Sequence, residues 1–307
     1  KVNCFYTSVT IFRFLRNVIK ANKTLQDFSP NNIPLPLDRI GSCGEPLAHE
    51  IGVWAINFFK PKRKTIVNTY FQTETGGILT APRDEDGIPS DYSCVGRPRD
   101  DLGITIAKNV MDNDRLKKEN IEPNELLVCK SWDGIFLEVI SDRETKYFTS
   151  EGYFRLHDVG YFDEEGFLYI GGRSDDVINI NGHRISTSEI ENICISVKAI
   201  NEVCAVSIPD KISGTKLILF YSSTNTTENI KNKIEDELTA VIRKNLSKDH
   251  LPKKFYFFES LPKTKSGKIM RRLMRDLITK NKNYLNTDYS TLANKEQFIK
   301  SKNNFFN

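Results

Sequence analysis

The hydrophobic pattern at the start of the chain predicts one amphipathic helix. Across residues 5–20, apolar side chains such as Ile11, Phe14 and Val18 recur at helical spacing. Residues 31–36 contain prolines and asparagines and are predicted to be a connector. A new apolar pattern begins after this connector.

Residues 39–69 alternate between short apolar runs and a longer helical pattern. Residues 39–43 are predicted to end a buried strand, and a turn at Gly44 leads into a helix over residues 48–60. Residues 65–69 are predicted to form another short strand. The order of strand, glycine turn, helix and strand is typical of α/β proteins, in which ligand-binding loops follow strand ends.

The pattern changes in the middle of the chain. Residues 83–125 are charged and rich in loop-forming residues. Short β-segments are predicted over residues 124–130, 136–140 and 166–170, consistent with a distorted barrel or a sandwich. The two glycines that follow the last segment mark a break.

A compact unit is predicted after the break. Residues 186–189 (STSE) fit a capping box at the start of a helix. The strands and helices together indicate a small α+β domain of about 100 residues. In order they are strand 177–180, helix 187–196, strands 203–208 and 217–222, helix 227–245, strand 255–258 and a helix after Lys268.

Composition and charge narrow the possible functions. Hydrophobic residues make up 39% and charged residues 27% of the 307 residues, which is ordinary for a soluble globular protein. The net charge of +4 is too small to indicate nucleic-acid binding without a concentrated patch, and residues 263–275 are the one such patch. No apolar run is long enough to span a bilayer.

The cysteines argue against a zinc site and a disulfide framework, because they are scattered without CxxC spacing. Buried free thiols in a reducing compartment are the expectation. The six are Cys4, Cys43, Cys94, Cys129, Cys194 and Cys204.

The segment 261–272 (LPKTKSGKIMRR) contains a candidate functional lysine. Pro262 stiffens its entry, and Gly267 favours a turn that exposes Lys268 near a helix start. A lysine in such a place is a mobile positive charge, suited to a carboxylate or a phosphate. Alone, the segment would be interpreted as a solvated basic turn.

Two further motifs change that interpretation. Residues 70–77 (YFQTETGG) and residues 172–184 (GRSDDVININGHR) precede the lysine segment in the chain. In this order and spacing, the three resemble the signature motifs of the adenylate-forming superfamily, which includes acyl-CoA synthetases, peptide-synthetase adenylation domains and luciferases. Within it, the chain is most similar to acetate–CoA ligases.

The resemblance implies an enzyme that activates acetate with ATP to acetyl-AMP and then transfers the acetyl group to CoA. It implies ATP with Mg²⁺ and CoA as ligands, no nucleic-acid partner and no stable membrane insertion, in the cytoplasm, with the nucleus as a second compartment. The oligomeric state stays open.

The resemblance also implies the latter part of a longer enzyme. The family's phosphate loop is expected upstream, so this stretch alone is expected to be inactive. Residues 1–174 would be the latter part of an AMP-binding domain, with an α/β subdomain and a distorted β-barrel. Residues 175–280 would be a small mobile α+β domain, and residues 281–307 a polar tail.

The nucleotide site is implied at two strand ends and a later turn. Thr73 would meet the α-phosphate, and Glu74 would hold Mg²⁺ bound to ATP. Asp158 and Arg173 match the ribose-binding pair, although the usual Thr-Gly-Asp is Leu-His-Asp here, and a structural role is favoured for His157. The full set is Gly44, Glu45, Pro46, Asn68, Thr69, Tyr70, Phe71, Gln72, Thr73, Asp158, Arg173 and Arg184.

The acyl pocket departs from the acetate-specific pattern. Where those enzymes carry Asp-Thr-Trp-Trp, this chain has Asn-Thr-Tyr-Phe at residues 68–71. Phe71 takes the position of the tryptophan that closes the pocket, so the site would admit one more methylene, worth about 1–3 kcal/mol of discrimination. Cys43 would also line this pocket, with core packing as its alternative.

In the small domain the resemblance implies a hinge and a CoA site. Asp175 would be the hinge, and Arg184 would meet the nucleotide phosphates. Gly182 would let the pantetheine arm pass, beside Asn181 where the family usually has serine. Arg243 matches an arginine that meets CoA, with a solvated helix cap as its alternative.

Lys268 would bridge the acyl carboxylate and the α-phosphate, together with Thr73 and Arg184 as catalytic groups. Two alternatives stay open. One is a ligase for propionate or another short acid, and the other is a basic nucleic-acid- or membrane-binding module carried by residues 263–275.

Overall fold

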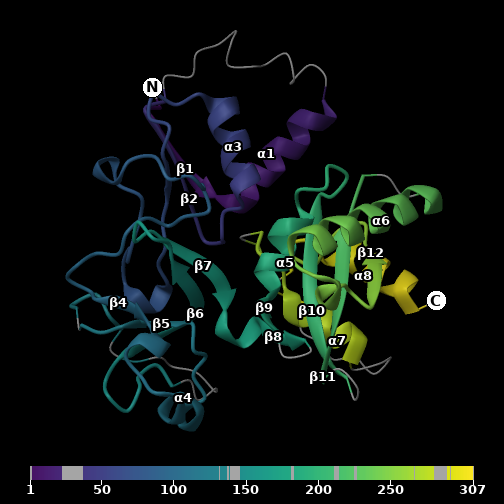
Figure 1. Cartoon of the computed structure of the whole chain (residues 1–307). Coiled ribbons are helices and arrows are strands. Elements are labelled where there is room, and N and C mark those ends of the chain that lie inside the picture. Colours follow the sequence, from purple (N-terminus) through teal and green to yellow (C-terminus); the bar gives the residue numbers. More distant parts are fainter. Residues whose placement is uncertain are drawn as a thin grey trace. The chain divides into compact units, whose positions relative to one another are not determined.

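The computed structural model describes residues 2–22, 37–130, 132–136, 138, 146–180, 183–210, 214–224, 227–265, 267–279, 289–290 and 292–306. The chain divides into two compact units, Lys1–Asp175 (unit 1) and Asp176–Asn307 (unit 2). Figure 1 shows the elements of each unit.

Unit 1 begins with a parallel sheet in the order β1-β2-β3. All neighbouring strands in it run parallel, and β1 pairs with β2 from Cys4↔Arg39 to Ser8↔Cys43. The elements of this part are β1 (Cys4–Ser8), α1 (Val9–Ala21), β2 (Arg39–Cys43), α3 (His49–Phe59) and β3 (Ile66–Asn68).

The helix predicted over residues 5–20 begins at Val9, so the first part of that prediction was wrong. Residues 5–8 belong to β1 because they pair with β2, a non-local contact that helical spacing cannot reveal. Ser8 caps the helix by accepting a hydrogen bond from the Ile11 amide at 3.4 Å. The predicted connector over residues 31–36 lies outside the described residues.

The second part of unit 1 is a four-stranded sheet in the order β4-β5-β6-β7, all antiparallel. Within the described residues it is an open sheet and does not close into the barrel that was expected. Its longest strand, β6, was not predicted, and the two glycines interpreted as a break lie inside β7. The elements are β4 (Ile104–Ile106), α4 (Asn113–Glu119), β5 (Glu125–Val128), β6 (Phe154–Phe162) and β7 (Leu168–Arg173).

Short 3₁₀ turns connect these elements; they span Thr73–Thr75, Asp84–Asp86, Ala107–Asn109, Ser174–Asp176 and Lys248–His250. All six cysteines are free thiols; Cys94, Cys194 and Cys204 are buried, as expected, whereas Cys4 is exposed. No helix within the described ranges combines the length and apolar character needed to cross a membrane.

Unit 2 is an α+β unit, as predicted. A three-stranded sheet has the order β10-β11-β12, with β11 antiparallel to β10 and parallel to β12, and β8 and β9 form a separate hairpin. The Ser186 hydroxyl caps α5 by accepting from the Ser188 amide at 3.0 Å. The elements are β8 (Val177–Ile180), β9 (His183–Ser186), α5 (Thr187–Cys194), β10 (Glu202–Asp210), β11 (Gly214–Ser222), α6 (Glu228–Asn245), β12 (Lys254–Phe257), α7 (Arg271–Thr279) and α8 (Lys295–Phe306).

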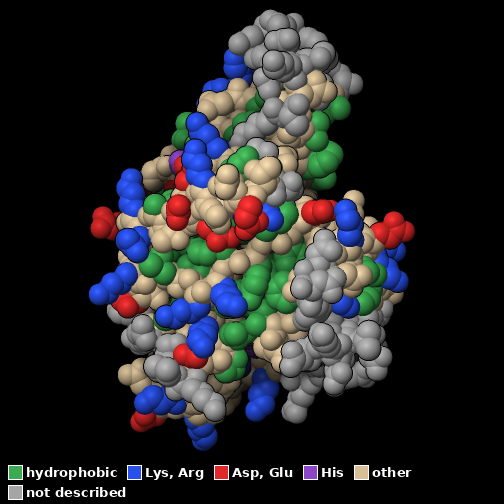
Figure 2. Space-filling model, turned by 90° about the vertical axis from the view of Figure 1, so that its right-hand side faces the viewer, with side chains coloured by type: hydrophobic (Ala, Val, Ile, Leu, Met, Phe, Trp, Pro, Cys, Tyr) green, Lys and Arg blue, Asp and Glu red, His purple; other side chains and the backbone are tan. Residues whose placement is uncertain are grey.

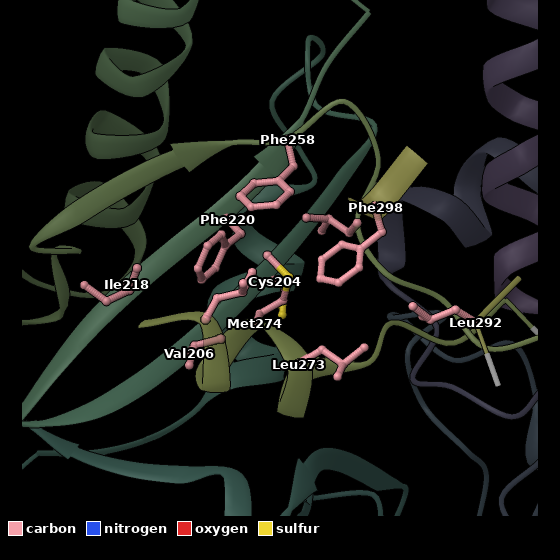
Figure 3. Packing of buried hydrophobic residues seen from close by; sticks show 11 residues of the cluster. Cys204, Val206, Ile218, Phe220, Phe258, Leu273, Met274, Leu292 and Phe298 are labelled. Carbon is pink, nitrogen blue, oxygen red and sulfur yellow. The ribbon is translucent and has the colours of Figure 1, made fainter. Parts of the chain in front are cut away.

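The core of unit 2 includes part of the segment that was predicted to be a polar tail. Leu292 and Phe298 pack with Leu273 and Met274 of α7 in one buried cluster (Figure 3). The Phe298 ring stacks on Phe258 with centroids 6.4 Å apart. A few apolar side chains in this Asn- and Lys-rich stretch therefore anchor it to the core.

Candidate functional site

The implied nucleotide loops of unit 1 leave the carboxyl ends of parallel strands. Residues 44–46 follow β2 directly, and Thr69 follows β3. Since neighbouring parallel strands end at the same edge of a sheet, both loops start from one edge. Gly44 has φ +83°, a conformation that favours glycine.

Asn68 has a structural role in this edge. It is buried, with 2% of its surface exposed, and its Oδ1 accepts a hydrogen bond from the Ser42 hydroxyl at 2.9 Å. Its Nδ2 donates to the backbone oxygens of Ser93 at 3.2 Å and Cys94 at 3.0 Å. These bonds tie three segments of unit 1 together, so Asn68 has a structural role whether or not it contacts a nucleotide.

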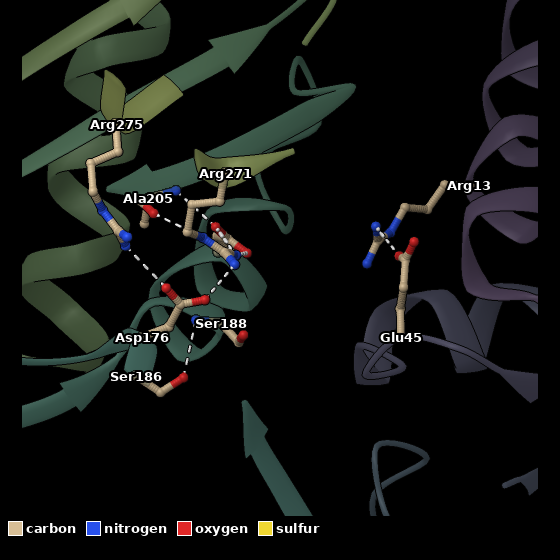
Figure 4. A network of polar contacts seen from close by, with 9 residues as sticks. Arg13, Glu45, Asp176, Ser186, Ser188, Ala205, Arg271 and Arg275 are labelled. Carbon is tan, nitrogen blue, oxygen red and sulfur yellow. Dashed lines mark hydrogen bonds and ion pairs between the residues drawn. The ribbon is translucent and has the colours of Figure 1, made fainter. Parts of the chain in front are cut away.

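Glu45 is held by helix α1 (Figure 4). Its Oε1 accepts from the Thr10 hydroxyl at 2.7 Å, and its Oε2 forms an ion pair with Arg13 at 3.0 Å. Thr69, next to Asn68, is buried and hydrogen-bonded to Tyr6 and to the Ser42 backbone. Both side chains, assigned from sequence to the nucleotide, thus fix the loops that carry them.

The first motif meets the implied ribose pair at Asp158. The Tyr70 hydroxyl donates to Asp158 Oδ2 at 2.7 Å, and Gln72 Nε2 donates to the same oxygen at 2.6 Å. Arg173, the strand partner of Asp158, lies 3.6 Å from Oδ1. Burial and the Asp158 carboxylate raise the pKa of Tyr70 well above its ordinary value, so its hydroxyl stays protonated. Four sequence-predicted residues therefore come together.

The Thr73–Thr75 turn is held rigidly against a second loop. Thr75 Oγ1 bonds the backbone of Gln72, and the indole of Trp132 donates to the Thr75 carbonyl at 3.0 Å. Gly76 has φ +63°, and a Cβ there would lie 1.9 Å from the Gly134 oxygen. On this fixed turn Thr73 is exposed and Glu74 is half-buried.

The two implied acyl-pocket residues differ in exposure. Phe71 is 42% exposed, although it is a large apolar side chain. Cys43 is half-buried at the end of β2, with its Sγ 3.8 Å from the Thr7 carbonyl.

His157 occupies a left-handed conformation, with φ +52°, directly before Asp158. Its Nδ1 lies 3.7 Å from Glu125, which forms a buried bidentate ion pair with Arg155, and its buried Nε2 finds no hydrogen-bond partner among the described residues. Burial lowers the pKa of His157 and outweighs the attraction of Glu125. These contacts agree with the structural role favoured from sequence.

In unit 2, Lys268 lies on a short hairpin three residues before α7, and it is exposed. Arg243 is exposed in the last turn of α6. Arg184 lies in β9 opposite Asn179, and the backbone of Asp175 lies in the turn between the two units. The side chains of Arg184 and Asp175 lie outside the described residues, as do Asn181 and Gly182 entirely.

Sequence reasoning missed an ion-pair network at Asp176, the residue after Asp175 (Figure 4). Arg271 donates to Asp176 Oδ2 at 2.8 Å and to both carboxylate oxygens of Glu191 at 2.7 and 2.8 Å. Arg275 donates to Asp176 Oδ1 at 3.1 Å. Burial opposes the charge of Arg271, but Glu191 and Asp176 outweigh it and raise its pKa. A signal for this network was present in the sequence. Arg271 and Arg275 are one helical turn apart in a helix that also carries buried apolar residues, a spacing that places both arginines beside the core.

Comparison with known proteins shows which proteins the chain resembles. Residues 189–268 match the model of the AMP-binding enzyme C-terminal domain. The chain is 33% identical over 300 residues to the acetyl-coenzyme A synthetase of Vibrio parahaemolyticus, and 34% over 297 residues to that of Aeromonas hydrophila; each match covers 95% of this chain. Over 95% of its length the chain is thus similar to acetyl-coenzyme A synthetases, and its residues 189–268 match the C-terminal domain of AMP-binding enzymes.

Solved structures of adenylate-forming ligases share the fold. A benzoate CoA ligase from Burkholderia xenovorans matches 89% of this chain with a TM-score of 0.68 and 21% identity, over 51% of its own length. The o-succinylbenzoate CoA synthetase from Bacillus subtilis matches 90% with a TM-score of 0.66 and 22% identity, also over 51% of its length. The chain spans 44% of the length of the two acetyl-coenzyme A synthetases it matches.

Proposed function

We propose that the protein is an AMP-forming acid–CoA ligase that acts on acetate. The observation that carries this proposal is the 33% identity, over 95% of the chain, to a protein named acetyl-coenzyme A synthetase. In the first step a carboxylate oxygen of acetate attacks the α-phosphorus of ATP, and pyrophosphate leaves. In the second step the CoA thiolate attacks the carbonyl carbon of acetyl-AMP, and AMP leaves.

Asp158 is the proposed ribose reader. A carboxylate has about four acceptor positions, and Tyr70 and Gln72 both use Oδ2 of Asp158. In this proposal Asp158 would also accept from the ribose hydroxyls, with Arg173 3.6 Å from its Oδ1. Tyr70 and Gln72 would orient the carboxylate, and Thr73 would donate its exposed hydroxyl to the α-phosphate.

Lys268 is the proposed catalytic residue of the first step. Its ammonium group would bridge acetate and the α-phosphate, where negative charge develops, and Arg184 would hold the phosphates. For the second step, unit 2 would turn about Asp175 and present Asn181 and Gly182 to the pantetheine arm, with Arg243 near CoA. No enzyme nucleophile is required for either step.

Magnesium would arrive with ATP. The described residues contain no group of three or more histidine, cysteine, aspartate or glutamate side chains arranged to hold a metal ion. Mg²⁺ bound to nucleotide needs only one or two protein carboxylates because it keeps phosphates and waters as ligands. Glu74, half-buried on the fixed turn, fits that requirement.

A ligase for propionate is the second candidate. It is favoured by Phe71, which is smaller than tryptophan and 42% exposed. With Phe71 and Cys43 as lining residues, the acyl pocket would accept one more methylene. This candidate uses the same chemistry and the same nucleotide site.

The basic segment 263–275 does not support a nucleic-acid function. Lys263 forms an ion pair with Glu202, and Arg271 and Arg275 form ion pairs with carboxylates of unit 2. On the face seen in Figure 2, basic side chains are interspersed with acidic ones. Much of the charge of this segment is thus balanced within the unit.

Acid-dependent ATP–pyrophosphate exchange by the full-length protein tests the proposal. The assay would compare acetate, propionate and butyrate at equal concentrations. We expect the highest specificity constant for acetate and a substantial one for propionate. A preference for propionate would favour the second candidate, and no exchange with any acid would refute the ligase assignment.

A further inference from the structure

The hairpin that carries Lys268 is closed by hydrogen bonds around Thr264. The Thr264 amide donates to the Lys268 carbonyl at 2.9 Å, and the Lys268 amide donates to the Thr264 hydroxyl at 3.1 Å. The Gly267 amide donates to the Thr264 carbonyl at 2.8 Å, and Gly267 has φ +89°. So short and exposed a hairpin needs external support to hold one conformation.

The segment before α8 supplies that support. Leu292 pairs with Thr264 in an antiparallel bridge, and the Ala293 amide donates to the Lys263 carbonyl at 2.8 Å. Lys263 in turn pairs with Ile269 on the other side of the hairpin. Residues 260–264 form the outer arm of the hairpin. This arm is thereby held between two neighbouring segments, one of which carries Lys268.

Asn294 uses its whole amide group on this arm. Its Oδ1 accepts from the Lys263 amide at 3.0 Å. Its Nδ2 donates to the Leu261 carbonyl at 2.7 Å and to the Ser260 hydroxyl at 2.8 Å. Asn294 is half-buried, and its amide makes three hydrogen bonds to this arm.

The segment that contains Asn294 is itself anchored. Leu292 on one side of it is 7% exposed, and Phe298 on the other side is fully buried in the core of unit 2 (Figure 3). The amide of Asn294 therefore connects the core to the arm of the hairpin.

We propose that Asn294 is a positioning residue for Lys268, an inference that rests on the ligase function proposed above. Asn294 does not touch the substrate in this proposal. It fixes the hairpin arm so that Lys268 reaches acetate and the α-phosphate in one geometry. Because a misplacement of about 1 Å can cost about 10²-fold in rate, loss of this support lowers adenylation without removing any reacting group.

Two variants and one control isolate the effect. Asn294→Ala removes all three side-chain bonds. Asn294→Asp keeps the acceptor for the Lys263 amide but loses the donor to the Leu261 carbonyl. Asn303→Ala changes the same residue type at an exposed position of α8 and serves as the matched control.

Amide hydrogen exchange tests the support without reference to catalysis. In the full-length protein, Asn294→Ala should speed exchange at the amides of Lys263, Gly267 and Lys268 by about tenfold or more, the equivalent of about 1.4 kcal/mol. Exchange in β10 and β11 and in the Asn303→Ala control should match wild type. Equal acceleration throughout unit 2 would show a general stabilising role and overturn the proposal, as would unchanged exchange in the hairpin.

Separate assays of the two half-reactions test the consequence. Asn294→Ala should lower the kcat of ATP–pyrophosphate exchange about 10- to 100-fold with little change in the KM for ATP. Thioester formation from supplied acetyl-AMP should stay within about twofold of wild type, with Asn294→Asp between the two. A raised KM at unchanged kcat, or an equal loss in both half-reactions, would overturn the role. If the wild-type protein showed no ATP–pyrophosphate exchange, the ligase function and this role of Asn294 would both be refuted. The amide hydrogen-exchange result would still decide whether Asn294 orders the hairpin.

Discussion

Arg271→Met should destabilise unit 2 while leaving unit 1 unchanged. Methionine keeps much of the length of the side chain but removes the bonds to Asp176, Glu191 and the Ala205 carbonyl. The Arg271 side chain is 22% exposed, and those of Asp176 and Glu191 are 16% and 18% exposed. The substitution therefore leaves two largely buried carboxylates without their main cation.

The expected loss of unfolding free energy depends on the partners that Asp176 and Glu191 keep. Removing one partner of a buried ion pair costs about 3–5 kcal/mol. Asp176 keeps Arg275, and Glu191 keeps the Ala205 amide at 2.8 Å, so the lower end applies, about 3 kcal/mol. With a urea m-value of about 1.5 kcal/mol/M, the midpoint for unit 2 should fall by about 2 M.

The two units can be followed separately. Both tryptophans, Trp54 and Trp132, lie in unit 1, so tryptophan fluorescence reports that unit alone. Far-UV circular dichroism reports both units. We expect Arg271→Met to shift a transition seen by circular dichroism and not the transition seen by fluorescence.

The control is Arg272→Met, which removes an equal charge from an exposed neighbour. A surface substitution of this kind should change the unfolding free energy by about 0.5 kcal/mol or less. If Arg271→Met shifted the midpoint no further than Arg272→Met, the network would contribute nothing measurable, and the reasoning above would fail.

Four further predictions concern the proposed reaction and unit 1. Lys268→Ala should abolish adenylation, measured by pyrophosphate exchange, but retain thioester formation from supplied acetyl-AMP; an equal loss of both would contradict the assigned role. Phe71→Trp should raise the ratio of specificity constants for acetate over propionate, because overpacking costs about 1–3 kcal/mol and falls on the longer acid; an unchanged ratio would remove Phe71 from the pocket. Asp175→Pro should impair the thioester step more than adenylation, since proline fixes φ, whereas Asp175→Ala should spare both; equal effects of proline on both steps would rule out a hinge there. The folded-state pKa of His157 lies below its unfolded value of about 6.5, so its contribution to unit 1 should be complete above that pH and be lost as pH falls below it. Urea unfolding followed by tryptophan fluorescence from pH 7.5 to 5.5 checks this, and His157→Asn, which tolerates the left-handed conformation, should flatten the slope.

The local sequence pattern was sufficient to predict most of the strands and helices of unit 2. Its strands and helices are short and separated by turns, and each carries its own periodicity, so the predicted ranges agree with β10, β11, α5 and α6 to within a few residues. The start of the chain shows the limit of this reasoning. Residues 5–8 have no local strand signal strong enough to separate them from the helix that follows, and only their pairing with β2 makes them a strand.

The candidate site was predicted in part, for a physical reason. Motif residues whose role depends on chemical type, such as Gln72 and Asp158, could be named from sequence, and the structure brings them together. Whether a polar side chain is used inside the protein depends on its partners. The side-chain amide of Asn68 is hydrogen-bonded to Ser42 and to two backbone carbonyls, and that of Asn294 is hydrogen-bonded to the Lys268 hairpin. In both cases the partners are far away in the sequence.

The placement of Leu292 and Phe298 in the core of unit 2 has a consequence for biosynthesis. A chain emerging from the ribosome completes the strands of unit 1 once Arg173 has appeared, and it can fold that unit early. Unit 2 has to wait for nearly its whole length to complete its core, because Phe258 lacks the stacked ring of Phe298 until that residue has been made. A chain terminated before Leu292 would therefore expose an aromatic surface and become a target for chaperones and proteases, although all its sheet strands had already been made.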